Sequence, residues 1–236
     1  MKKLMFITSV ILLSVGWFFF SRGDLYRNVK SSCDSLASNR QCLKVDVDNS
    51  YYIFKDRKGE FHNLLVPMEK ISGVESGRLY FNGSNFFYNA WRDRSLLKLE
   101  GVKDETIYGM AINSRYGRSQ DQLHIHFSCL KPSMHKLLSE KNKGLYGQWT
   151  KLSLEKEGQE FDFVKISYFD FKGGAVFPLV FGFSVNNKIS LERIGVGVVV
   201  WGGDVFVLIR VADLGRFEFA SVGDILDYSC SLAGKS

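Results

Sequence analysis

His124 and His126 are the residues whose types and spacing most clearly predict chemistry in this chain of 236 residues. They lie in residues 111–130, a stretch typical of a strand, a polar turn and a second strand. Because side chains alternate between the two faces of a strand, both histidines share one face with Ser128. The residues of the opposite face can pack into a core: Ile125, Phe127 and Cys129. Since an imidazole can attack phosphorus and form a phosphoramidate, this row predicts a phosphate-handling site.

The turn before the histidines carries groups that suit phosphate oxygens. Asn113 lies eleven residues before His124, at the end of an apolar stretch. Arg115 and Arg118 supply positive charge, and Gln120 supplies an amide donor. Guanidinium groups and backbone N–H groups bind phosphate well, so we expect this turn to lie against a diphosphate.

The histidine segment resembles the signature of the histidine-triad (HIT) superfamily, His-φ-His-φ-His-φ-φ, in which φ is apolar. The segment reads His124-Ile125-His126-Phe127-Ser128-Cys129-Leu130, with serine at the third histidine position. Asn113 and Gln120 match the asparagine and the glutamine that precede the triad in that superfamily.

A narrower resemblance is to the CDP-diacylglycerol pyrophosphatases, or CDP-diacylglycerol hydrolases, which are membrane-anchored HIT-like enzymes of bacteria. It is carried by INSR-x-GR-x-Q at residues 112–120, followed by HIH-x-SC at residues 124–129. Residues 64–71 and 85–91 share in the likeness, which extends over the signature region 51–132.

The resemblance implies an enzyme that hydrolyses the diphosphate of CDP-diacylglycerol to CMP and phosphatidate. We expect no metal or other cofactor if arginine and backbone donors carry the charge of the diphosphate. His126 would be the nucleophile, His124 would orient and stabilise the site, and Ser128 would donate a hydrogen bond to a phosphate or leaving oxygen. The substrate oxygens and charge would be held by the four turn residues: Asn113, Arg115, Arg118 and Gln120.

Other functions fit the same residues. A different HIT-type nucleotide hydrolase, or a nucleotidyltransferase with another acceptor than water, would share the histidine intermediate. Because Ser128 replaces the third histidine, a non-catalytic lipid- or nucleotide-binding module also stays open. The histidine pair could instead be structural or a partial metal site. A third ligand near in sequence is missing, since we expect His62 and His135 at the surface.

The N-terminus predicts a membrane anchor over residues 1–22. Residues 4–21 carry no charge, and this stretch is long enough to span a bilayer as a helix. Trp17 near its end suits a membrane interface. Lys2 and Lys3 favour a cytoplasmic N-terminus, which predicts a single-pass protein of the bacterial inner membrane with its catalytic domain on the periplasmic side. A cleaved signal peptide and a buried core helix are the alternatives.

Four cysteines follow the predicted anchor, and an even count in an exported domain indicates disulfides. Of the three possible connectivities we favour Cys33–Cys42 with Cys129–Cys230, although Cys129 could also be a buried free thiol. Zinc is disfavoured because the sequence has no CxxC pair. The net charge of +6 is modest, and no basic cluster or recognition motif indicates nucleic acid.

The remaining pattern predicts an α+β fold with a HIT-like antiparallel sheet and flanking helices. We expect a polar connector at 23–50 and the catalytic domain at 51–236, in whose C-terminal part, 149–236, the resemblance is weak. The predicted helices cover residues 25–36, 85–97, 134–141 and 221–228. The predicted strands cover residues 51–54, 61–66, 106–113, 122–130, 149–154, 162–167, 195–200 and 205–211.

Overall fold

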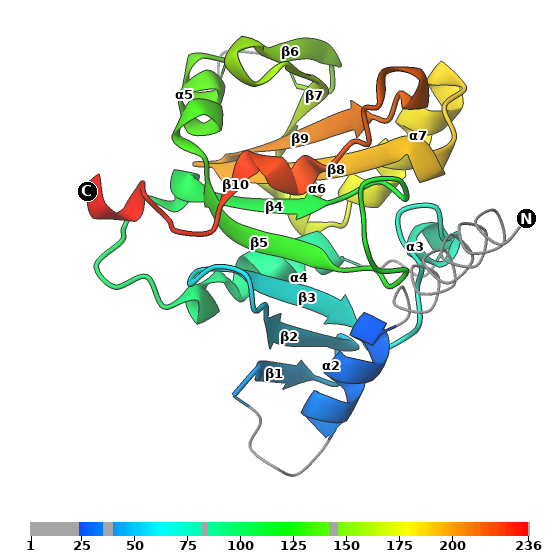
Figure 1. The fold of residues 1–236 in the computed structure, drawn as a ribbon. Helices are drawn as coiled ribbons and strands as arrows, with labels where there is room; N and C mark the ends of the chain where they lie inside the picture. The colour runs from blue at the N-terminus through cyan, green and yellow to red at the C-terminus, as the bar shows by residue number, and fades with distance from the viewer. Residues whose placement is uncertain (1–23, 35–39, 82–84, 142–145, 236) are drawn as a thin grey trace, which may run out of the picture.

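The fold is built on one antiparallel sheet, seen in a computed structural model that describes residues 24–34, 40–81, 85–141 and 146–235. The sheet has ten strands in the described residues (Figure 1). They are β1 (Cys42–Asp46), β2 (Tyr51–Lys55), β3 (Asn63–Pro67), β4 (Tyr108–Ile112), β5 (Ile125–Leu130), β6 (Thr150–Leu154), β7 (Gln159–Ser167), β8 (Ile194–Trp201), β9 (Asp204–Val211) and β10 (Leu226–Asp227). Their order is β1-β2-β3-β5-β4-β8-β9-β7-β6, and β10 pairs with the end of β5.

Helices cover both faces of the sheet. The α-helices are α2 (Asp24–Asp34), α3 (Arg78–Phe81), α4 (Phe86–Arg92), α5 (Pro132–Lys141), α6 (Tyr168–Lys172) and α7 (Val176–Asn187). Short 3-10 helices cover Arg94–Leu97, Glu105–Ile107, Glu155–Glu157, Leu191–Arg193, Leu214–Arg216, Val222–Ile225 and Ala233–Lys235. The predicted α+β class, an antiparallel sheet with flanking helices, is therefore confirmed.

The two faces bury different cores. Residues of α4 and α7 pack on the largest core, behind the sheet as Figure 1 shows it. On the opposite face Val29 of α2 packs on alternate residues of β2 and β3, while α5 and the C-terminal segment cover the other half. With both faces covered, β2 and β3 are buried along nearly their whole length and read as apolar runs.

The register of the central strands positions the histidine segment. His126 of β5 lies between Leu64 of β3 and Ala111 of β4. The predicted hairpins at 51–66 and 195–211 are present as β2–β3 and β8–β9. Pairing of β4 with β8 joins the two hairpin units into one sheet.

The predicted terminal helix at 221–228 is wrong. The chain forms one 3-10 turn, Val222–Ile225, and then the short strand β10. Ser221 makes no side-chain cap at the start of this turn. Instead the Lys131 N–H donates to the Ile225 carbonyl (2.9 Å), and Leu226 pairs with Leu130. Long-range pairing with β5 therefore outweighs the local capping signal.

The segment predicted as a connector contains α2 and β1, which pack on and pair with β2. A disulfide between Cys33 and Cys42 joins α2 to β1, as predicted. The predicted anchor at residues 1–22 lies outside the described residues. Within the part of the chain that the structure describes, no helix is both long and apolar enough to cross a membrane.

Gly195 of β8 allows the C-terminal segment to lie directly on the sheet. An added Cβ would lie 2.5 Å from the Ala220 carbonyl oxygen and 2.6 Å from Val222 Cγ2. We expect Gly195→Ala to lower the free energy of unfolding by about 1–3 kcal/mol, because backbone must move to relieve the overlap. The matched control is Gly203→Ala, where no atom lies within 4 Å. Urea unfolding of both variants measures this, and equal stabilities would contradict the close approach.

Candidate active site

A buried hydrogen bond joins two histidines that are distant in sequence. His62 Nε2 lies 2.9 Å from His126 Nδ1, and His62 Nδ1 lies 2.9 Å from the Lys58 carbonyl oxygen. His62 is 1% exposed, although the sequence predicted it at the surface. That prediction is wrong because His62 immediately precedes β3, two residues before Leu64, and so shares the face on which Leu64 lies beside His126.

The Lys58 carbonyl fixes the protons of both rings. A carbonyl oxygen only accepts, so His62 Nδ1 carries the proton and donates it. Neutral His62 then has its lone pair on Nε2, which accepts a hydrogen bond from His126 Nδ1–H. In this arrangement His126 Nε2 carries a lone pair. That atom is shielded from solvent and has no hydrogen-bond partner among the described residues.

His124 is held in the same tautomer. Its Nδ1 donates to the Gln122 carbonyl oxygen (2.6 Å), so its Nε2 also carries a lone pair. The ring meets the His126 ring edge-on, with centroids 4.7 Å apart. His124 therefore lies beside His126 and shapes its surroundings.

Burial keeps the three imidazoles neutral. It lowers the pKa of His62 to about 4, and it lowers the pKa of His124. Burial, with the neighbouring His124 and His62 adding to it, holds the pKa of His126 well below its usual value of 6.5. The lone pair on His126 Nε2 is therefore available at neutral pH.

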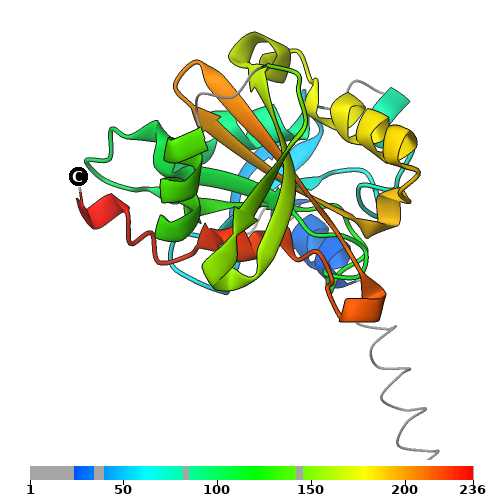
Figure 2. The same cartoon turned by 90° about the horizontal axis from the view of Figure 1, so that it is seen from above.

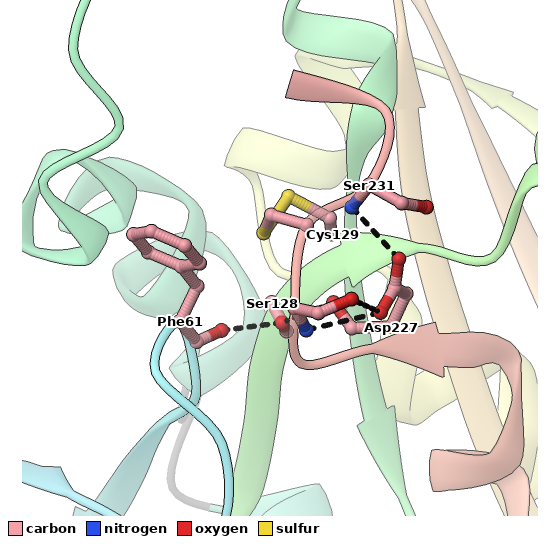
Figure 3. The surroundings of a disulfide bond; sticks show 7 residues. Phe61, Ser128, Cys129, Asp227 and Ser231 are labelled. Atoms are coloured by element: carbon pink, nitrogen blue, oxygen red, sulfur yellow. Dashed lines mark hydrogen bonds between the residues drawn. A yellow bond between two sulfur atoms is a disulfide. The ribbon is translucent and has the colours of Figure 1, made fainter. Parts of the chain in front are cut away.

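The C-terminal segment closes one side of the cluster. The Tyr228 ring stacks on the His62 ring, with centroids 3.8 Å apart and planes within 5°. A disulfide between Cys129 and Cys230 fastens this segment to β5, as predicted, and the Asp227 carboxylate accepts from the Ser231 N–H (2.8 Å; Figure 3). Tyr228 is thus held between these fixed points.

The predicted amide ligands hold the ends of the site together. Asn113 Oδ1 accepts from the Gly223 N–H (2.8 Å), which ties the end of β4 to the C-terminal segment. Gln120 Oε1 accepts from the Leu25 N–H (3.0 Å), which ties the turn to α2. Direct contact of either amide with a substrate stays a prediction.

Both predicted arginines are paired with carboxylates. The Arg118 guanidinium is buried and donates to both carboxylate oxygens of Glu75 (2.9 and 2.6 Å) and to Asp121 (3.0 Å). Arg115 pairs with Glu192 across the surface. These ion pairs fix the turn between β4 and β5, and the binding of a diphosphate by either arginine stays a prediction.

A cavity of about 480 Å³ lies between α2 and the turn that follows β2, and none of the three histidines is among its lining residues. It shares Lys58 with the hydrogen-bonded chain and Leu64 with the strand beside His126. Its lining is Leu25, Asn28, Ser31, Ser32, Gln41, Phe54, Asp56, Arg57, Lys58 and Leu64. The described residues contain no group of three or more His, Cys, Asp or Glu side chains placed to hold a metal ion.

Comparison with known proteins places the chain in a family. The model of the family described as CDP-diacylglycerol pyrophosphatase matches residues 20–234. A protein of Yersinia pestis named CDP-diacylglycerol pyrophosphatase is 30% identical over 243 residues, covering 98% of this chain and 94% of that protein.

The chain belongs to the CDP-diacylglycerol pyrophosphatase family.

Two solved structures share part of the fold. A DUF4931 family protein from Bacillus cereus has a TM-score of 0.48 at 11% identity, covering 78% of this chain and 95% of that one. Yeast Ap4A phosphorylase Apa2, in complex with AMP, has a TM-score of 0.44 at 14% identity. The match covers 77% of this chain and 65% of that one. The family match confirms the predicted family and the prediction of a hydrolase.

Ser128 is surrounded by backbone groups in this member of the pyrophosphatase family. Its side chain is fully buried, and its hydroxyl lies within hydrogen-bond distance of the Phe61 carbonyl and of the Asp227 carbonyl (3.1 Å; Figure 3). A hydroxyl has one proton to donate, and both neighbours only accept. The third position of the triad motif therefore joins β5 to the C-terminal segment, and its predicted role in catalysis is untested.

The Cys129–Cys230 disulfide should matter more than Cys33–Cys42 for stability and for the site. In the chain-entropy account, closing loops of 101 and 9 residues stabilises by about 5 and about 3 kcal/mol. We expect the double variant Cys129→Ser, Cys230→Ser to lose more stability than Cys33→Ser, Cys42→Ser. It should also lose activity, because Tyr228 is released from His62. Chemical unfolding and turnover of both pairs measure this; equal losses would show that the C-terminal segment is held without its disulfide.

Proposed function

We propose that this family member hydrolyses CDP-diacylglycerol to CMP and phosphatidate, with His126 Nε2 as the nucleophile. The observation that carries the proposal is the chain from the Lys58 carbonyl through His62 to His126 Nδ1, which leaves the lone pair of His126 on Nε2. A nucleophile needs its lone pair free and its ring held in one orientation, and this chain supplies both.

In the first step His126 Nε2 attacks the phosphorus on the cytidine side. The bond from that phosphorus to the bridging oxygen breaks, phosphatidate leaves with the electron pair, and CMP stays bonded to His126. In the second step water attacks the same phosphorus, the nitrogen–phosphorus bond breaks, and one proton of the water passes to solvent. CMP leaves, and His126 regains its lone pair.

His62 stabilises the charge that forms in the first step. When Nε2 bonds to phosphorus, the imidazole becomes positive and its Nδ1–H becomes a stronger donor. That proton already points at His62 Nε2, and neutral His62 can accept it as a hydrogen bond. Because burial lowers the pKa of His62 to about 4, His62 stays neutral at pH 7.

The leaving group explains how the reaction can proceed with Ser128 in place of a histidine. Phosphatidate is a phosphomonoester with a second pKa near 6, so it leaves as a stable anion at neutral pH without a strong acid. Ser128 then has a structural role, because its one hydroxyl proton is donated to a backbone carbonyl, that of Phe61 or that of Asp227, beside the histidines.

The cavity beside α2 is the space we assign to the substrate. Arg57 and Lys58 on its rim can neutralise diphosphate charge, while Leu25, Phe54 and Leu64 provide apolar wall. We further infer a periplasmic site on the inner membrane and a role in phospholipid metabolism. Two disulfides support an oxidising compartment, and the apolar N-terminal sequence supports a tether near a lipid substrate.

Release of CMP tests the nucleophile directly. We expect the full chain in detergent micelles, with a metal chelator present, to release CMP from CDP-diacylglycerol. His126→Ala should lower the rate by about a thousandfold or more, as for removal of a nucleophile. His135→Ala is the control, because His135 bonds Thr106 away from the cluster. An inert wild type, or a His126→Ala variant with near-normal turnover, would refute the proposal; turnover of other nucleotides would then be measured.

The role of His62 predicts that two substitutions at this position differ in their effect on kcat/KM. A glutamine oxygen can take the place of His62 Nε2 and accept from His126 Nδ1–H, whereas an asparagine is too short. We expect His62→Asn to lose about a hundredfold or more in kcat/KM and His62→Gln to lose much less.

In the wild type, neutral His126 is the reactive form, so activity should fall as the pH drops through the pKa of His126, which lies below 6.5. An acid limb centred at or above 6.5 would contradict the buried, neutral site.

A further inference from the structure

Large apolar side chains are exposed together at one end of the sheet. Tyr116 lies in the turn between β4 and β5, and the others follow β9 in residues 213–219. We call Tyr116, Leu214, Phe217 and Phe219 the aromatic tip. Their exposed fractions are 39%, 46%, 80% and 46%. Exposed apolar residues that gather in one place mark a contact surface more often than exposed residues that are scattered.

The two segments of the tip are fastened to each other. Ser114 Oγ donates to the Phe219 carbonyl (2.5 Å), and the Ser114 N–H donates to the Ala220 carbonyl (3.2 Å). Gly117 lies against the same stretch, so an added Cβ would lie 2.6 Å from the Phe219 carbonyl oxygen. The two segments are therefore joined at this end of the sheet, where the turn that follows β9 projects from the fold (Figure 2).

The backbone presents Phe217 at a conformational cost. Its φ is +57°, in the left-handed region that residues other than glycine rarely adopt. The side chain is 80% exposed, so little burial within the described chain offsets that cost. Phe217 takes this conformation as the C-cap of the 3-10 turn Leu214–Arg216, where its N–H donates to the Leu214 carbonyl (3.3 Å).

The chain arrives from the predicted anchor at this same end. α2 begins at Asp24, two residues after the anchor predicted at 1–22. Its first turn is bonded to the β4–β5 turn, because the Leu25 N–H donates to Gln120 Oε1 (3.0 Å). The same turn carries Tyr116. The point where a tether would leave the bilayer and the aromatic tip therefore belong to one end of the fold.

We propose that the aromatic tip rests in the interfacial layer of the phospholipid bilayer and sets the orientation of the domain on the membrane. Aromatic rings are favoured at the headgroup level, where one side is apolar and the other is wet. Phenylalanine and leucine side chains insert at the boundary of the acyl chains. Two contacts, the tether and the tip, fix an orientation that a tether alone leaves free.

This orientation bears on the proposed function without depending on it. α2 forms one wall of the cavity assigned to the substrate, and its first turn lies at the membrane-facing end. A lipid diphosphate at headgroup height would then meet the cavity without leaving the bilayer.

Quenching by brominated lipid tests the contact. The full chain is reconstituted into vesicles of phosphatidylethanolamine and phosphatidylglycerol, with or without brominated acyl chains. Phe217→Trp is compared with Phe169→Trp, since Phe169 is 83% exposed but follows β7 at the opposite end of the sheet. After subtraction of the wild-type signal, we expect bromine to reduce the emission of Trp at 217 at least twofold and to leave Trp at 169 unchanged.

Two outcomes overturn the proposal. One is equal emission at position 217 with and without bromine, which would place the tip in water. The other is shielding that rises with protein concentration and is insensitive to bromine, which would show that a second copy of the chain covers the tip. The measurement needs no turnover, so its failure is distinct from the failure of the proposed hydrolysis.

A kinetic comparison supplies a second readout. Phe217→Ser should lower CMP release several-fold when CDP-diacylglycerol is embedded in vesicles. It should leave the rate unchanged when a short-chain substrate is dissolved as monomers. Equal effects on both substrates would show that Phe217 acts on the fold and not on membrane contact, which contradicts the proposal.

Discussion

The site depends on the direction of one hydrogen bond, from His126 Nδ1 to His62 Nε2. A neutral imidazole has one proton and one lone pair, so fixing the proton on one nitrogen exposes the lone pair of the other. The Lys58 carbonyl fixes His62, and His62 fixes His126. The bond exists only because β3 pairs with β5 in a register that places Leu64 beside His126. Burial then removes the protonated alternative, which would leave no acceptor for the bond.

The C-terminal segment turns this pair of rings into an enclosed cluster. Tyr228 stacks on the face of His62, and the Ser128 hydroxyl lies within hydrogen-bond distance of the Phe61 and Asp227 carbonyls, to which it has one proton to donate. The position where a third histidine would stand thus contributes to architecture. Serine in place of a third histidine is chemically consistent with a leaving group that needs no strong acid. The Cys129–Cys230 disulfide keeps the arrangement in place.

Much of the fold follows from local pattern. The alternating and apolar runs predict the two main hairpins, and the even cysteine count together with loop lengths predicts both disulfides. The row of His124 and His126 on one strand face is also readable, because a strand has a period of two. Each of these features is predicted by residues that lie close together in the sequence, or by the four cysteines alone.

The unpredicted features depend on pairing over long distances. His62 appears as an isolated polar residue until the register of β3 against β5 is known. Residues 221–228 carry a helix start signal, yet pairing with β5 determines their structure. Arg118 looks like a phosphate ligand by its place in the motif, but its partner Glu75 is 43 residues away. One signal was available for His62: it precedes an apolar strand at the spacing of that strand's buried face.

The placement of Tyr228 has a consequence for how the enzyme matures. Ribosomes make the chain from residue 1 onward, so β3 and β5 exist long before the segment that closes over them. The histidine cluster lacks this cover through most of synthesis, and the disulfide that fastens the cover, between Cys129 and Cys230, spans 101 residues and forms only by oxidation. In a reducing compartment the covering segment would lack its covalent link to β5, and its closure over His62 would depend on strand pairing and ring stacking alone.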